Sequence, residues 1–168
     1  RIYKPAFAEK FQELMRAKLG LQTTQADDGK LFDGLFEVLH GSHADFTLFF
    51  RSLGNVKIDT PDSWEPVRDL FIDRASFDGW AQQYIARLKT ENSQDEPRKL
   101  AMHAVNPKYV LRNYLAQIAI EKAQNKDFSE VAKLLQVLEK PFDEQPENEK
   151  YAALPPDWAN DLEVSCSS

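Results

Sequence analysis

Apolar residues recur at helical spacing along almost the whole chain, and this periodicity limits the folds that it can adopt. They form stripes in six segments: 7–19, 31–39, 46–53, 77–88, 110–119 and 128–138. Such spacing is typical of amphipathic helices that pack one face against a core. Segments in which apolar and polar residues alternate, as in a half-buried strand, are scarce. The sequence therefore predicts an all-α protein of about seven to nine helices.

Single residues predict where several of these helices begin and end. Gly20 is placed to stop the first helix, and the carboxylate of Asp45 can accept the free N–H groups that start another. Asn106 followed by Pro107 predicts a third start, because proline at the first helical position loses no hydrogen bond. We therefore expect a helix that runs on from Pro107.

The helix expected after Asp127 has the clearest stripe. Asp127 and Glu130 form a capping-box pattern, in which each carboxylate meets N–H groups at the helix start. Pro141 ends this helix, because proline cannot donate the next backbone hydrogen bond. One face is expected to be buried: Phe128, Val131, Leu134, Leu135 and Leu138.

Acidic residues and prolines are concentrated at one end of the chain. The net charge is −6, and residues 141–168 hold seven acidic residues and one lysine, whereas residues 1–140 hold 20 charges of each sign. Four of the nine prolines lie within 141–156. We therefore expect a helical domain, 1–140, wrapped by an acidic Pro-rich tail, 141–168, within one structural unit. Four apolar side chains would anchor the tail: Phe142, Tyr151, Leu154 and Trp158.

This charge distribution excludes two classes of partner. A nucleic-acid binder needs a basic face, and anionic membranes attract basic segments, whereas this chain has no excess of basic residues. No apolar run approaches the roughly 18 residues that a membrane span requires. We expect neither nucleic acid nor a membrane as partner.

Residues that could hold a nucleotide or a metal ion are sparse. The six glycines are never closer than five residues apart, so no glycine-rich loop can wrap phosphate groups. His40 and His43, with Asp45 nearby, form the one metal-like group, but Gly41 lies between the histidines at an expected turn. We interpret them as turn and cap residues, and we expect no nucleotide-binding or metal-binding residue in this chain.

The segment 106–117 interleaves polar side chains with a strongly apolar stripe. The polar members are Tyr109, Arg112, Asn113 and Gln117. These groups could hydrogen-bond a partner surface that the apolar stripe alone could not orient. The alternative is ordinary packing behind a capped helix start.

Cys166 is the single cysteine, which excludes an intrachain disulfide and a cysteine-based zinc site. A lone thiol in a polar segment is a candidate for a redox or covalent role. Asp161 and Glu163 disfavour its thiolate form, however, so a cysteine without a function is the alternative.

Several segments together resemble the selenoprotein O family, whose bacterial members are known as YdiU. The longest is NPKYVLRNYLAQ at 106–117, and VSCSS at 164–168 is similar to the terminus at which some animal members carry selenocysteine. Shorter similar segments are KLGL at 18–21, DFTLFFR at 45–51, PFDEQ at 141–145, YA at 151–152 and PPDWA at 155–159. The resemblance covers essentially the whole chain.

The resemblance implies that the chain is the C-terminal third of a longer protein. Family members have a protein-kinase-like fold and are classed as pseudokinases. They transfer AMP from ATP to Ser, Thr or Tyr hydroxyls of target proteins, using Mg²⁺ or Mn²⁺. The residues that bind ATP and metal precede the matched region, so none maps onto this sequence. We therefore expect this chain to be inactive alone and to support or gate the N-terminal catalytic domain.

The resemblance also assigns a role to Cys166, the one functional position that maps directly onto this sequence. Cys166, as the counterpart of selenocysteine, is expected to be a redox-responsive group paired with a cysteine of the catalytic domain. The four polar residues of 106–117 are expected to contact that domain. Cysteine in place of selenocysteine indicates a bacterial source and hence a cytoplasmic protein. Two alternatives stay open: a thiol redox protein that uses Cys166, and a helical interaction domain without chemistry.

Overall fold

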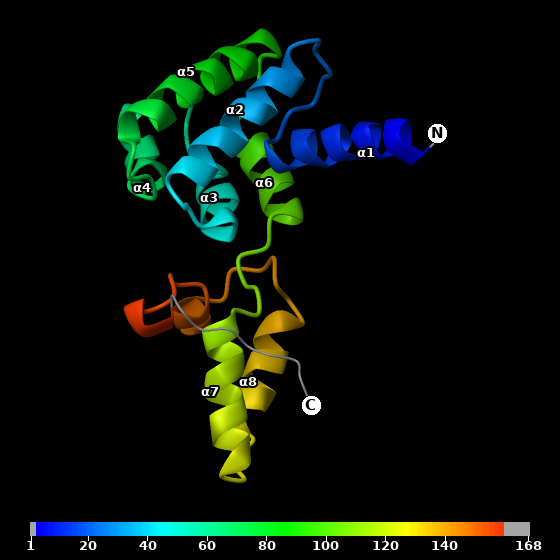
Figure 1. Ribbon diagram of the computed structural model, residues 1–168. Helices are drawn as coiled ribbons and strands as arrows, with labels where there is room; N and C mark the ends of the chain where they lie inside the picture. The colour runs from blue at the N-terminus through cyan, green and yellow to red at the C-terminus, as the bar shows by residue number, and fades with distance from the viewer. Residues whose placement is uncertain (1–2, 160–168) are drawn as a thin grey trace. The chain divides into compact units, whose positions relative to one another are not determined.

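The computed structural model describes residues 3–159, with side chains from residue 6 onward. Over these residues it contains eight α-helices, three short 3-10 helices and no β-strand (Figure 1). This architecture confirms the all-α prediction. No helix in the described part of the chain is long and apolar enough to cross a membrane.

The chain forms two compact units, 1–106 and 107–168, and each has its own apolar core. This division differs from the expected one at 140. The reason is that the two helices before Pro141 share their core with Tyr151 and Ala152, which lie beyond it. The Pro-rich segment is thus part of the second unit.

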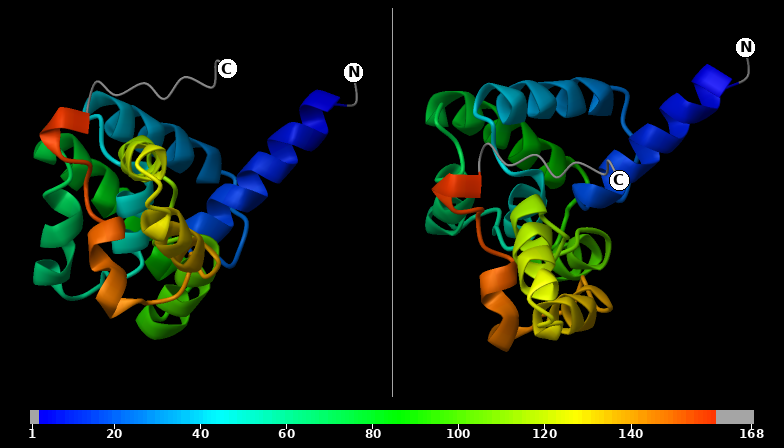
Figure 2. Two further views of the ribbon diagram at one scale, coloured as in Figure 1. Left: turned by 90° about the horizontal axis from the view of Figure 1, so that it is seen from below. Right: turned by 60° about the horizontal axis from the view of Figure 1, so that its bottom comes forward.

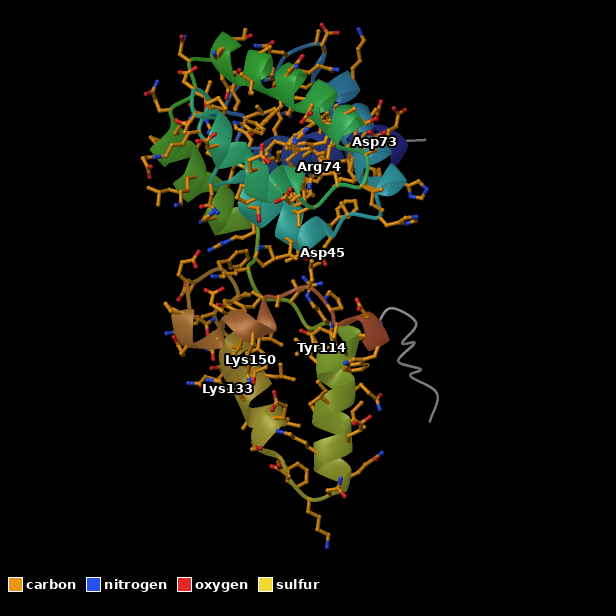
Figure 3. The ribbon with its side chains drawn as sticks, turned by 90° about the vertical axis from the view of Figure 1, so that its left-hand side faces the viewer. Asp45, Asp73, Arg74, Tyr114, Lys133 and Lys150 are labelled. Atoms are coloured by element: carbon orange, nitrogen blue, oxygen red, sulfur yellow. The ribbon has the colours of Figure 1, made fainter. Side chains whose placement is uncertain are left out.

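The first unit is built from α2 (Asp28–Gly41) and α5 (Arg74–Thr90), which lie side by side, with five further helical segments around them (Figure 1). These are α1 (Tyr3–Lys18), α3 (Phe46–Leu53), η1 (Pro61–Trp64), α4 (Glu65–Arg68) and α6 (Asp95–Val105). Asp45 accepts the N–H of Leu48 at 2.8 Å, which confirms its predicted role as the cap of α3. Asp73 caps α5 in the same way, and Figure 3 shows both carboxylates at their helix starts.

Aromatic side chains fill the centre of this unit. The buried ring of Phe49 meets Phe71 and Trp80 edge-on, with centroids 5.7 and 5.8 Å apart, and Tyr84 stacks on Trp80 at 5.2 Å. The polar groups of Trp80 and Tyr84 both donate hydrogen bonds to backbone carbonyls. Trp80 donates to the carbonyl of Leu31 at 3.0 Å, and the Tyr84 hydroxyl donates to that of Leu19 at 2.6 Å. These bonds let large polar rings lie in the core without an unpaired group.

Three arginines are buried in the first unit, and two of them, Arg87 and Arg98, are paired there with carboxylates. Arg87 donates to Asp28 at 2.7 Å and to Glu91 at 2.9 Å. Arg98 is 0% exposed and donates to Asp95 at 2.8 Å. Removing one partner of such a pair leaves a buried charge uncompensated, which is strongly destabilising. Two of these pairs join residues three or four positions apart, whereas Arg87 and Asp28 are 59 positions apart, so no local pattern in the sequence predicts that pair.

α1 projects away from the other helices of its unit (Figures 1 and 2). The expected stripe exists, but only Met15 and Leu19, at its end, are buried. Phe7, Phe11 and Leu14 are exposed. The first turns of α1 therefore present an apolar face that the described residues of the first unit do not bury.

The second unit contains α7 (Asn113–Gln124), α8 (Ser129–Leu138), η2 (Pro146–Tyr151) and η3 (Asp157–Ala159). The expected helix start at Pro107 was wrong: α7 begins at Asn113. Asn106 instead follows the last turn of α6, and Pro107 begins a connection without regular secondary structure. The connection is bonded to the residue that follows α8 and its last turn, because the N–H groups of Lys108 and Tyr109 both donate to the carbonyl of Pro141, at 2.8 and 3.1 Å.

The predicted burial and capping of α8 were also partly wrong. Leu134 is buried and Leu138 packs against the core, but Phe128, Val131 and Leu135 are exposed. The buried face of α8 is therefore rotated from the predicted face, by about one residue along the sequence. Glu130 does not complete a capping box, because it accepts from the Tyr151 hydroxyl at 2.8 Å.

Of the four expected tail anchors, Tyr151 is buried, whereas Phe142, Leu154 and Trp158 are exposed. The ring of Trp158 still meets Tyr114 of α7 edge-on, with centroids 6.2 Å apart. The Pro-rich segment is therefore held mainly through Tyr151 and through polar bonds.

Candidate functional site

Asn106, the first residue of the motif 106–117, joins two helix ends of the first unit. It is buried, and its amide N–H donates to the carbonyl of Lys18 at 2.9 Å while its amide oxygen accepts from the Lys18 ammonium at 3.0 Å. Arg51 donates to the carbonyls of His103 and Asn106, at 3.1 Å each. Burial lowers the pKa of Lys18. This part of the motif fixes the end of α1 against the end of α6.

Tyr109 anchors the second unit. Its ring is buried, and its hydroxyl donates to the carbonyl of Gln145 at 3.0 Å. Gln145 in turn donates to the carbonyls of Val137 and Lys140, at 3.0 and 2.9 Å, which lie at the end of α8 and just after it. Burial raises the pKa of Tyr109. Two segments of the family resemblance, 106–117 and 141–145, are thus bonded to each other.

Lys108 reinforces the same connection. Its ammonium lies 2.6 Å from Glu144 and also pairs with Glu149. Burial opposes the charge of Lys108, but the two carboxylates outweigh it and raise its pKa. The acidic residues of the Pro-rich segment therefore have a local basic partner.

The other three polar residues of the motif lie at the start of α7. Arg112 is half-buried immediately before the helix, beside Tyr114, which Figure 3 labels at the top of α7. Asn113 is exposed, and Gln117 donates to Glu121 of the same helix at 2.8 Å. The structure thus places Arg112, Asn113 and Gln117 along one helix and Tyr109 apart from them in the core. A contact of these four residues with another domain stays a prediction.

Cys166, with the rest of the segment 164–168, lies outside the described residues. Its expected redox role stays a prediction.

The described residues include carboxylates and cations, the kinds of group that bind metal ions and phosphates. They include no group of three or more His, Cys, Asp or Glu side chains that could hold a metal ion. An open pocket of about 320 Å³ lies between η1 and α5, and Arg68 is a cation in its wall. Arg68 is paired with both oxygens of Asp78, at 2.7 and 2.9 Å, so its charge is already matched. Lining of this kind does not suit a triphosphate.

The first unit carries a row of aromatic rings that was not predicted from the sequence. Successive ring centroids lie 5.9 to 6.5 Å apart, and the row crosses three helices. We call it the aromatic row: Phe7 and Phe11 of α1, Phe36 of α2, and Phe46 and Phe50 of α3. The stripes of the three helices are visible in the sequence, but the sequence does not show that these five rings meet in space.

Comparison with known proteins gives a consistent result. Residues 1–139 match the sequence model of a family described as "Protein adenylyltransferase SelO". A protein nucleotidyltransferase YdiU of Herminiimonas arsenicoxydans is 83% identical over 168 residues, which are 100% of this chain and 34% of that protein. Proteins of the same name from Burkholderia vietnamiensis and Paraburkholderia xenovorans are 57% and 56% identical, over 96% and 99% of this chain and 31% and 32% of their own lengths. The chain therefore spans about a third of the length of the curated relatives that it matches.

Proposed function

The chain belongs to the protein adenylyltransferase SelO family, and we propose that it is the C-terminal helical region of a member that transfers AMP from ATP to Ser, Thr or Tyr hydroxyls of proteins. The observation that carries this proposal is the family match over residues 1–139. The relative that is 83% identical across the whole chain is named a nucleotidyltransferase, which supports it.

In this proposal the chain supports the chemistry without performing it. ATP and Mg²⁺ or Mn²⁺ would be held by residues outside the chain, and the divalent ion would neutralise the charge of the phosphates. Two observations support this division: the wide spacing of the glycines, and the use of carboxylates such as Asp28 and Asp95 in ion pairs with arginine.

The chain's own residues would position the surfaces that meet the catalytic part. The bonds of Asn106 to Lys18 and of Tyr109 to Gln145 hold helix ends and connections in fixed places. Arg112, Asn113 and Gln117 are the proposed contacts to the catalytic domain, and Cys166 is the proposed redox-responsive group. Target proteins would bind to the whole molecule.

The test uses the full-length protein and ATP labelled in turn on the α- and γ-phosphate. Transfer of AMP retains the α-label on protein and releases the γ-label with pyrophosphate. We expect α-label on protein and no γ-label, and no labelling by the 168-residue chain alone.

Each opposite result has a distinct meaning. Protein labelled from γ-labelled ATP indicates phosphoryl transfer and overturns the reaction proposed. Labelling by the chain alone overturns the division of labour. No labelling by the full-length protein, with either nucleotide, favours the interaction domain without chemistry.

A further inference from the structure

The aromatic row continues from the core of the first unit into solvent. Phe50, at one end, is buried, Phe36 is half-buried, and Phe46 is 48% exposed. Phe11 and Phe7 extend the row along α1, where Phe7 is 62% exposed. Leu14 lies on the same face of α1, seven residues after Phe7, and is also exposed. A contiguous exposed apolar surface on a soluble protein marks a binding site far more often than scattered apolar residues do.

The row is held in place from its buried end. Phe50 packs edge-on against Phe49 in the core, with centroids 5.1 Å apart, and the Lys18 ammonium lies 4.8 Å from the Phe50 ring. Lys18 is itself bonded to Asn106, which fixes the end of α1. These contacts fix the C-terminal end of α1, from which the helix carries Phe11 and Phe7 outward. The buried end of the row is therefore formed before any partner binds.

The first turns of α1 have little to stabilise them within the first unit. Their apolar face is exposed, and a short helix in water is marginal without tertiary packing. Lys10 of α1 is paired with Glu13 at 2.8 Å. The exposed aromatic and aliphatic side chains of this face suit an apolar partner.

Resting on the function proposed above, we propose that the aromatic row is the docking surface for the remainder of the same polypeptide. Relatives that match this chain along its full length are about three times as long, so two thirds of the molecule lies outside it. A segment linked covalently to the row has a high effective concentration there. The occupant is an apolar face of that remaining part.

The test is hydroxyl-radical oxidation of phenylalanine side chains in the full-length protein, read by mass spectrometry. In the wild type, we expect Phe7 to be oxidised about fivefold more slowly than a phenylalanine in an unfolded peptide, because docking removes its exposed area. The double variant Phe11→Glu with Phe46→Glu restores rapid oxidation of Phe7. Leu100→Glu, at a more exposed apolar site on α6 outside the row, is expected to leave Phe7 protected and is the control.

Rapid oxidation of Phe7 in the wild type overturns the proposal without recourse to any variant. Sedimentation at several protein concentrations shows whether Phe7 is protected only in a dimer. Protection confined to the dimer also overturns the proposal, because the occupant is then a second copy of the protein. AMP transfer measured on the same sample separates the two proposals. An exposed Phe7 with AMP transfer intact refutes docking alone, and a protected Phe7 without AMP transfer refutes the reaction alone.

Discussion

Gly20 ends α1 with φ at +67°, in a place that has no room for a side chain. A Cβ there would lie 2.6 Å from Cγ of Arg98 and 2.8 Å from Cγ of Met102, both fully buried. We expect Gly20→Ala to lower the free energy of unfolding by about 2–4 kcal/mol, from the left-handed backbone and the crowding together. Urea unfolding measures the change.

Gly79 is the matched control for Gly20. It lies inside α5, and an added Cβ meets nothing within 4 Å. Gly79→Ala is expected to raise the free energy of unfolding by about 0.5–1 kcal/mol, because alanine favours the helix. A similar loss at both positions would contradict the role given to Gly20.

Glu130 and Tyr151 form the clearest pH-sensitive pair. The Tyr151 hydroxyl donates to Glu130 at 2.8 Å, and this bond lowers the pKa of the carboxyl. Burial, and then the same bond, raise the pKa of Tyr151 to about 12. A carboxyl whose pKa is lower in the folded state stabilises above its unfolded pKa, and the effect fades as pH falls through the folded value.

We therefore expect Tyr151→Phe to cost about 1–2 kcal/mol of unfolding free energy at pH 7 and progressively less below pH about 4.5, as Glu130 is protonated. Unfolding of wild type and variant between pH 7 and 3 measures this. Tyr84→Phe is the control, because its hydroxyl donates to a backbone carbonyl that does not titrate. If the loss of unfolding free energy in Tyr151→Phe stays constant down to pH 3, the pH dependence does not come from the bond between Tyr151 and Glu130.

At the scale of elements, α8 provides a direct test of which face is buried. Leu134 is 6% exposed and its neighbour Leu135 is 62% exposed. Leu134→Ala should cost about 2–4 kcal/mol, whereas Leu135→Ala should change the unfolding free energy by less than about 0.5 kcal/mol. Denaturant midpoints of the two variants measure the difference, and equal costs would show that the helix packs by the face predicted from sequence.

The elements also show how far sequence reasoning reaches. Apolar spacing identifies a helix because it is a local property, and the cap from Asp45 to Leu48 spans only three residues. Leu134 and Leu135 are equally apolar, however, so spacing alone leaves open which of them faces the core. Asn106 was misread as a helix start because its partner, Lys18, is 88 residues away.

The candidate site also has a part that local sequence predicts and a part that depends on tertiary contacts. The motif 106–117 is visible in the sequence, but the burial of Tyr109 depends on bonds to Pro141 and Gln145, in a different part of the chain. The aromatic row depends on three helices that meet in space. Both are tertiary facts that no local pattern encodes.

At the scale of the whole molecule, two cores of unequal size carry the fold. The core of the first unit extends over α1 to α6, whereas that of the second contains few buried residues. A small core supplies little stability, and polar ties such as Lys108 with Glu144 and Tyr151 with Glu130 supplement it. We therefore expect the second unit to open at a lower free energy than the first.

Native-state hydrogen exchange with one core variant in each unit tests this last expectation. Leu134→Ala should speed exchange of the α7 and α8 amides and leave those of α2 and α5 unchanged, because the two cores share no buried residue. Leu35→Ala, at a fully buried site of the first unit, should speed exchange in α2 and α5. In the wild type, α7 and α8 should exchange faster than α2 and α5. If either variant speeds exchange equally in all four helices, the chain opens as a single cooperative body.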